Sequence, residues 1–170
     1  MKIIKLIIFS IVSVFILNGC RTTLMPATVI RHSSLDQYKY FYIDQTNELT
    51  SGVSDSYGTQ NGLYGFSQTK TVNPSDLISG FLLKKGFTKL PEIKTNLLKE
   101  TLIINYGESG RRNVGILGAY TIEVVIQFIS AETHSVICSG VAEGMGSTEA
   151  DDIRIAINRC LDKIFSIDEQ

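Results

Sequence analysis

The chain lacks the residue groups on which several classes of function depend. It has two histidines, His32 and His134, and neither lies in a cluster of ligands at metal-binding spacing. It contains no Gly-x-Ser-x-Gly elbow, no complete phosphate-binding loop and no Asp-rich calcium loop. It also has no basic excess, with 16 Lys and Arg against 17 Asp and Glu, which argues against a nucleic-acid partner. We therefore predict a protein that is not an enzyme and that holds no metal or soluble cofactor.

The longest apolar stretch is too short to cross a membrane as a helix. Residues 6–17 are apolar except for two serines, whereas a spanning helix needs roughly 20 apolar residues. With Lys2 and Lys5 before it and Leu17-Asn18-Gly19-Cys20 at its end, the stretch resembles a bacterial lipoprotein signal peptide with a lipobox. The resemblance implies a diacylglycerol on the Cys20 thiol and a second acyl chain, such as palmitate, on its freed amine. The alternative is an ordinary secretory signal with a chance cysteine.

This resemblance divides the chain into three parts. We expect a signal peptide over residues 1–19, a lipidated tether over 20–37 and a single periplasmic α+β domain over 38–170. Fully extended, the tether would reach about 50 Å. Enterobacterial lipoproteins with Asp after the lipidated cysteine stay in the inner membrane, so Arg21 implies an outer-membrane anchor facing the periplasm. The predicted partner is thus the membrane itself, through the lipid.

Hydrophobic periodicity predicts the elements of the domain. Alternation of apolar and polar residues over 120–129 is typical of an antiparallel strand with one wet face. We also expect strands over 38–43, 101–106 and 136–143, with Glu123 and Glu143 facing one another on the wet side of a hairpin. Together with two amphipathic helices on one face, these strands predict an α+β two-layer sandwich, with a mainly antiparallel sheet of three to five strands.

Both predicted helices have clear start signals. Asn73-Pro74 supplies a cap and a first-turn proline, and Gly86 follows the last turn of the same helix. Ser147 or Thr148 caps the final helix. That helix carries an apolar stripe made of Ala150, Ile153, Ile157, Cys160, Leu161 and Ile164.

Two cysteines remain after the anchor. Cys138 is expected in a strand and Cys160 on the apolar stripe of the helix packed near it. In an oxidising compartment such a pair forms a disulfide if the Cα atoms approach within about 7 Å. The alternative is two buried thiols that act as small hydrophobic residues.

Residues 50–71 differ in composition from the rest of the domain. Ser, Gly, Thr and Gln dominate, and Asn61-Gly62 is a hairpin turn signal, so the segment is either a polar hairpin or a long loop. Tyr57, Tyr64 and Phe66 on such a scaffold suit a contact surface for a partner or a glycan. The alternative is that these aromatic side chains fold back onto the sheet.

A second Gly-rich segment, residues 107–118, carries a pair of arginines. Arg111 and Arg112 there either grip a carboxylate, a phosphate or a lipid headgroup, or occupy a solvated hairpin tip.

The C-terminal half resembles a recurrent pattern of Gram-negative lipoprotein domains. The pattern is a strand "YTIEVVIQFIS", a turn "AETHS", a strand "VICSGVAEG" and a helix "ADDIRIAINRCLDKIF". In outline it is similar to lipoproteins that activate penicillin-binding proteins and to the periplasmic domain of the curli-secretion lipoprotein. The resemblance implies a non-catalytic domain that binds another envelope protein. The alternatives are a protein that binds or hydrolyses cell-wall glycan or peptide, and a self-assembling structural lipoprotein.

Overall fold

The computed structural model describes residues 23–59, 62–114 and 119–166. The predicted signal peptide of residues 1–19 and Cys20, which together contain the lipobox, lie outside the described residues. The elements along the chain are β1 (Thr28–Arg31), β2 (Tyr40–Ile43), β3 (Leu49–Thr59), β4 (Gly62–Val72), α2 (Pro74–Lys84), β5 (Thr88–Lys89), the 3₁₀ helix η1 (Thr95–Glu100), β6 (Thr101–Asn113), β7 (Tyr120–Ser130), β8 (Val136–Gly144) and α3 (Glu149–Ser166).

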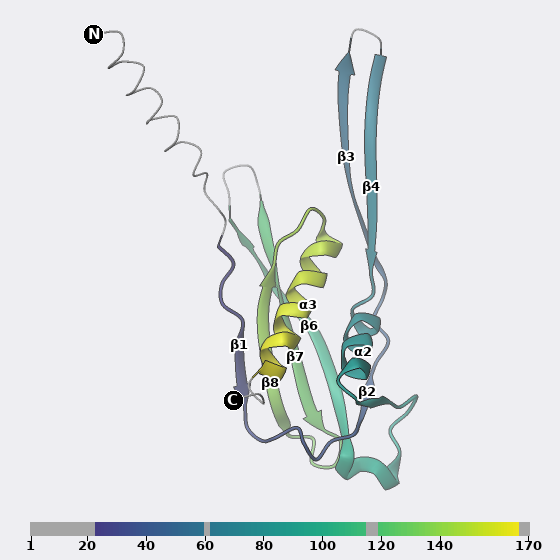
Figure 1. Cartoon of the computed structure of the whole chain (residues 1–170), viewed down its shortest axis with the longest axis vertical. Coiled ribbons are helices and arrows are strands. Elements are labelled where there is room, and N and C mark those ends of the chain that lie inside the picture. The colour runs from purple at the N-terminus through teal and green to yellow at the C-terminus, as the bar shows by residue number, and fades with distance from the viewer. Residues whose placement is uncertain (1–22, 60–61, 115–118, 167–170) are drawn as a thin grey trace, which may run out of the picture.

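The strands form a six-stranded sheet and a separate two-stranded ribbon (Figure 1). The sheet order is β1-β8-β7-β6-β2-β5. The first four strands pair antiparallel, whereas β2 is parallel to both β6 and β5. The α+β class is confirmed, but the sheet is larger than the three to five strands expected. The difference arises at the sheet edges, where β1 and β5 have only four and two residues and little pattern of their own.

The core lies between the sheet and helix α3. In β7 the residues of one face are fully buried, as the alternation predicted: Ile122, Val124, Ile126 and Phe128. The predicted stripe of α3 is buried throughout. Helix α2 lies beside α3 (Figure 1), and the rings of Phe81 and Phe165 join the two helices with centroids 5.6 Å apart.

Two glycines in β8 let α3 approach the sheet closely. A Cβ atom at Gly144 would lie 1.8 Å from the backbone oxygen of Asp152, and one at Gly140 would lie 2.6 Å from Cys160 Sγ. At Gly144 the contact would be with helix backbone, so only glycine fits there, whereas at Gly140 side chains of α3 would have to shift. The helix therefore rests directly on the backbone of β8.

The predicted helix caps are confirmed. The Asn73 side chain accepts the Ser75 N–H at 3.1 Å, and Thr148 Oγ1 accepts the Asp151 N–H at 3.2 Å. Gly86 follows α2 with φ of +92°, a conformation that favours glycine.

Two segments expected to be irregular are strands instead. Within the predicted tether of residues 20–37, residues 28–31 form β1, which pairs with β8 from Thr28↔Val141 to Arg31↔Cys138. The loop predicted for 107–118 was wrong in its first half, because β6 continues to Asn113 along β7, past a register shift between Glu108 and Gly110. In both places the pairing partner, rather than local composition, determines the structure.

The segment 50–71 is the hairpin of the two alternatives. Strands β3 and β4 pair over their whole length, from Leu49↔Val72 to Thr59↔Gly62. Gly62 thus belongs to strand β4, and Asn61 of the predicted turn lies outside the described residues. The ribbon extends well past the N-terminal end of α3 (Figure 1).

Candidate functional site

The β3–β4 ribbon is the candidate functional site. Successive residues of a strand lie on opposite faces, so the register assigns each pair to one face of the ribbon. One face begins with Leu49 and Val72, which pack against the core, and continues with Ser51 and Lys70 beside α3. The opposite face is exposed at its base, for example at Thr50. The core and α3 therefore cover one face of the ribbon at its base.

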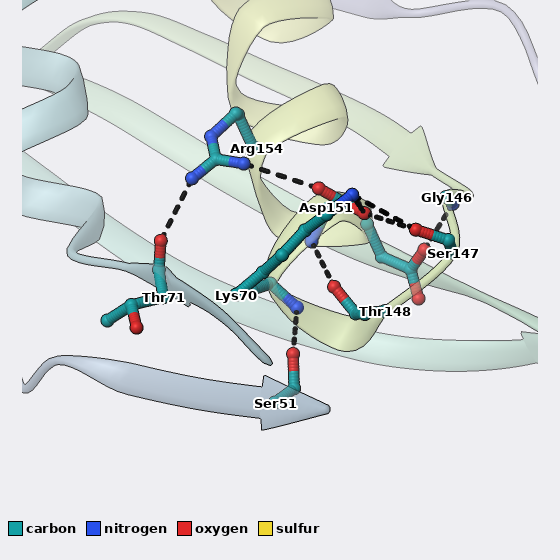
Figure 2. Close-up of polar contacts among 10 residues, drawn as sticks. Ser51, Lys70, Thr71, Gly146, Ser147, Thr148, Asp151 and Arg154 are labelled. Carbon is teal, nitrogen blue, oxygen red and sulfur yellow. Dashed lines mark hydrogen bonds and ion pairs between the residues drawn. The ribbon is translucent and has the colours of Figure 1, made fainter. Parts of the chain in front are cut away.

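Polar contacts fix the base of the ribbon to the first turn of α3 (Figure 2). Lys70 Nζ donates to Asp151 Oδ2 at 2.5 Å and to Ser147 Oγ at 3.1 Å. The Ser51 hydroxyl oxygen accepts the Ala150 N–H at 2.8 Å, so β3 satisfies a backbone donor that helix geometry leaves open. Both strands are thus tied to the same helix end.

Arg154 and Asp151 reinforce this attachment. Arg154 Nη2 donates to the Thr71 carbonyl at 2.9 Å, and its Nη1 lies 3.3 Å from Asp151 Oδ1 (Figure 2). The hydrogen bonds from Lys70 and then Ser147 lower the pKa of Asp151 to about 2, against the opposing effect of burial. Asp151 is therefore ionised at neutral pH and pairs with both cations. The local sequence does not reveal the pair with Lys70, because Lys70 in β4 is 81 residues away from Asp151.

The three aromatic residues predicted as contact groups lie on one face of the outer ribbon. Tyr57 pairs with Tyr64, and Phe66 pairs with Asp55. The alternation assigns all of these positions to the face that α3 covers at the base. Their side chains lie outside the described part of the structure.

The two predicted arginines are occupied within the chain. Arg112 forms a bidentate pair with Glu143, with Nε–Oε1 2.7 Å and Nη2–Oε2 2.6 Å. Arg111 pairs with Glu149 and lies over the Tyr120 ring, 4.9 Å from its centroid. Of the two alternatives, Arg112 does grip a carboxylate, but one supplied by β8 of the same chain.

The burial of the Glu143 side chain differs from the expectation from the sequence. The register does place it opposite Glu123, but its side chain is 4% exposed rather than on a wet face. The pair with Arg112 lowers the pKa of Glu143 to about 2, although burial acts in the opposite direction. No local sequence signal marks this residue, because its partner approaches only in the folded register of β6, β7 and β8.

Glu143 also holds the N-terminal segment of the domain. The Met25 N–H donates to Glu143 Oε2 at 3.0 Å, and Arg159 Nη2 donates to the Met25 carbonyl at 2.7 Å. A hollow of about 160 Å³ beside this contact is lined by Met25, Gly110, Arg111, Arg112, Glu123 and Glu143. The backbone just before β1 is therefore clamped to the end of the sheet. We call Glu143, Arg112 and Arg159 the Met25 clamp.

The two internal cysteines lie where the sequence predicted. Cys138 is in β8 and Cys160 is on α3, both are fully buried, and in the described structure they are thiols with no disulfide between them. Burial raises the pKa of Cys160 to about 12. This environment matches the buried-thiol alternative, and a disulfide formed under oxidation stays a prediction.

Two features are absent from the described residues. Among them, no group of three or more His, Cys, Asp and Glu side chains is placed to hold a metal ion. No helix within the described ranges is long and apolar enough to cross a membrane.

Comparison with known proteins adds little to this description. No family model and no curated protein matches the chain. One solved structure that matches is PelC from Paraburkholderia phytofirmans, a Leu-to-Met variant solved as a dodecamer. It shares 14% identity with this chain at a TM-score of 0.44, over 79% of this chain and 94% of PelC.

Proposed function

We propose that this chain is a lipid-anchored bacterial envelope lipoprotein whose domain acts by binding rather than by catalysis. Cys20 would carry the lipid, and the β3–β4 ribbon would be the element that contacts another envelope component. The outer membrane, with the domain in the periplasm, is the proposed location.

The observation that carries this proposal is the length of the ribbon beyond its attachment. Beyond Ser51 and Lys70 the two strands pair with each other, and Figure 1 shows their backbones standing apart from the helices and from the six-stranded sheet. An isolated two-stranded ribbon is marginally stable in water, and both of its strands have open edges. A partner surface that covers the ribbon would stabilise it and would cover its open strand edges.

The lipid anchor is tested by metabolic labelling of the full chain. Cells fed an alkyne-tagged palmitate should label the protein, and the Cys20→Ser variant should stay unlabelled and run as the uncleaved precursor. Labelling that survives Cys20→Ser would refute the anchor.

The ribbon is tested by shortening it without disturbing its attachment. We would replace residues 53–68 with Asn-Gly, which joins Gly52 to Thr69 by a two-residue turn suited to hairpins and keeps Ser51 and Lys70. The melting temperature should change little, because Leu49 and Val72, which pack the ribbon against the core, are kept. In-cell cross-linking followed by mass spectrometry should lose the component that the full chain captures.

A matched control places the change elsewhere on the surface. Leu83 is an apolar side chain of α2 that is 53% exposed, and Leu83→Ser should leave the captured component in place. If the shortened ribbon captures the same component as the full chain, the ribbon is not the contact element.

A further inference from the structure

The ribbon and the start of the domain lie at the same end of the molecule. β8 ends at Gly144, and β1 runs antiparallel to it, so the chain enters β1 from this end. Met25 is held here by Glu143, and Ser51 of the ribbon is bonded to the first turn of α3, which follows β8 directly. Figure 1 shows the ribbon projecting beyond this end, away from η1 and the turn between β7 and β8.

Little chain separates this end from the lipidated residue. The Met25 clamp fixes the backbone five residues after Cys20. Five extended residues span at most about 18 Å. This inference rests on the proposed lipidation of Cys20, which would place the membrane surface within that distance of Met25.

The ribbon is longer than this gap. Eight residues of β3 follow Ser51, whose hydroxyl is bonded to α3. At about 3.3 Å per residue they extend the ribbon about 26 Å beyond the body. A ribbon that projects about 26 Å from this end is long enough to reach a surface held within about 18 Å of Met25.

We propose that the outer end of the β3–β4 ribbon rests in the headgroup layer of the membrane that holds the anchor. The proposal deepens the assigned function by naming the contacted envelope component as a lipid surface. The chemistry of the ribbon fits this partner, because the sequence from Ser56 to Thr69 contains no Lys, Arg, Asp or Glu. Moving this stretch into the interface desolvates no charge.

The aromatic residues of the outer ribbon also suit a membrane interface. Tyr57, Tyr64 and Phe66 share one face by register, and tyrosine is enriched where headgroups meet the hydrocarbon core. The open edges limit the depth, because hydrocarbon leaves unpaired N–H and C=O groups unsatisfied. A single ribbon therefore stops in the headgroup layer, where water and lipid oxygens reach its edges.

The test measures the height of three sites above the membrane. The lipidated full chain would be reconstituted into phosphatidylethanolamine–phosphatidylglycerol vesicles with one fluorophore on Thr59→Cys, Thr69→Cys or Asn96→Cys. These positions lie at the outer end of the ribbon, at its base, and on η1 at the opposite end of the domain. Cys138 and Cys160 are fully buried and do not compete for the label.

A nitroxide quencher carried on lipid headgroups should remove most emission at Thr59, a small part at Thr69 and none at Asn96. A flexible Gly/Ser linker inserted after residue 22 should reduce the quenching at Thr59, because the anchor then no longer sets the height. If the protein floats with the vesicles but the quencher removes the same fraction of emission at Thr59 and at Asn96, the ribbon contact is overturned and the anchor remains supported. Protein that does not float with the vesicles would overturn the anchor, and this inference with it.

Discussion

Replacing Glu143 with Gln tests whether the Met25 clamp stabilises the fold. The folded pKa of Glu143 is about 2 against a usual value of 4.5, and its side chain is 4% exposed. At about 1.4 kcal/mol per pKa unit, the fold favours the charged form by about 3 kcal/mol. Arg112 is 36% exposed, so water recovers part of this energy in the variant, and we expect a loss of about 1–2 kcal/mol at pH 7.

The pH dependence supplies a second signature of the same interaction. Because the folded pKa lies below the unfolded value, the ion pair stabilises the fold above about pH 4.5, and this contribution is lost as the pH falls toward 2. The difference between the wild-type chain and Glu143→Gln should thus be full at pH 7 and shrink steadily below pH 4.5.

Urea unfolding of the chain without residues 1–20, followed by circular dichroism from pH 7 to pH 3, measures both effects. Glu123→Gln is the matched control, because Glu123 is the register partner of Glu143 but makes no ion pair with Arg112. Its change should stay within about 0.5 kcal/mol. If the two variants unfold at the same urea concentration at pH 7, the clamp does not stabilise the domain.

Three further predictions follow from the packing of α2 and α3. In thermal melts, Gly144→Ala should destabilise the domain by more than about 3 kcal/mol, because the added Cβ would lie 1.8 Å from a helix carbonyl oxygen. As the control, Gly80→Ala in α2 should stabilise the domain by about 0.5–1 kcal/mol, because its added Cβ would have no atom within 4 Å. Cys138 and Cys160 should react with a thiol reagent only after denaturation, and a denatured chain without reactive thiols would indicate a disulfide. Asp151→Asn should speed amide hydrogen exchange in β3 and β4 but not in β7, since it removes the carboxylate that holds the ribbon base.

Local signals predicted the elements that carry their own pattern. The caps at Asn73 and Thr148 and the alternation in β7 each reflect a preference within a few residues, and each was confirmed. β1 was missed because a four-residue edge strand has little pattern, and its partner β8 lies more than 100 residues away.

The sequence predicted only part of the candidate site. Composition identified the segment, and the Asn61-Gly62 signal favoured the hairpin, whose two strands the structure describes up to Thr59 and from Gly62. The attachment through Lys70 and the burial of Glu143 were not predictable, because both depend on which strands become neighbours. Charged residues without an evident partner in the sequence are expected on the surface. Here the partners are distant in the sequence and become neighbours only in the folded chain.

The pairing of β1 with β8 also governs when this protein is able to fold. Thr28 is synthesised 113 residues before its partner Val141. At roughly 5–20 residues per second, β1 waits several seconds for the strand that completes its side of the sheet. The six-stranded sheet therefore closes only after β8 has been synthesised, although β1 is made first.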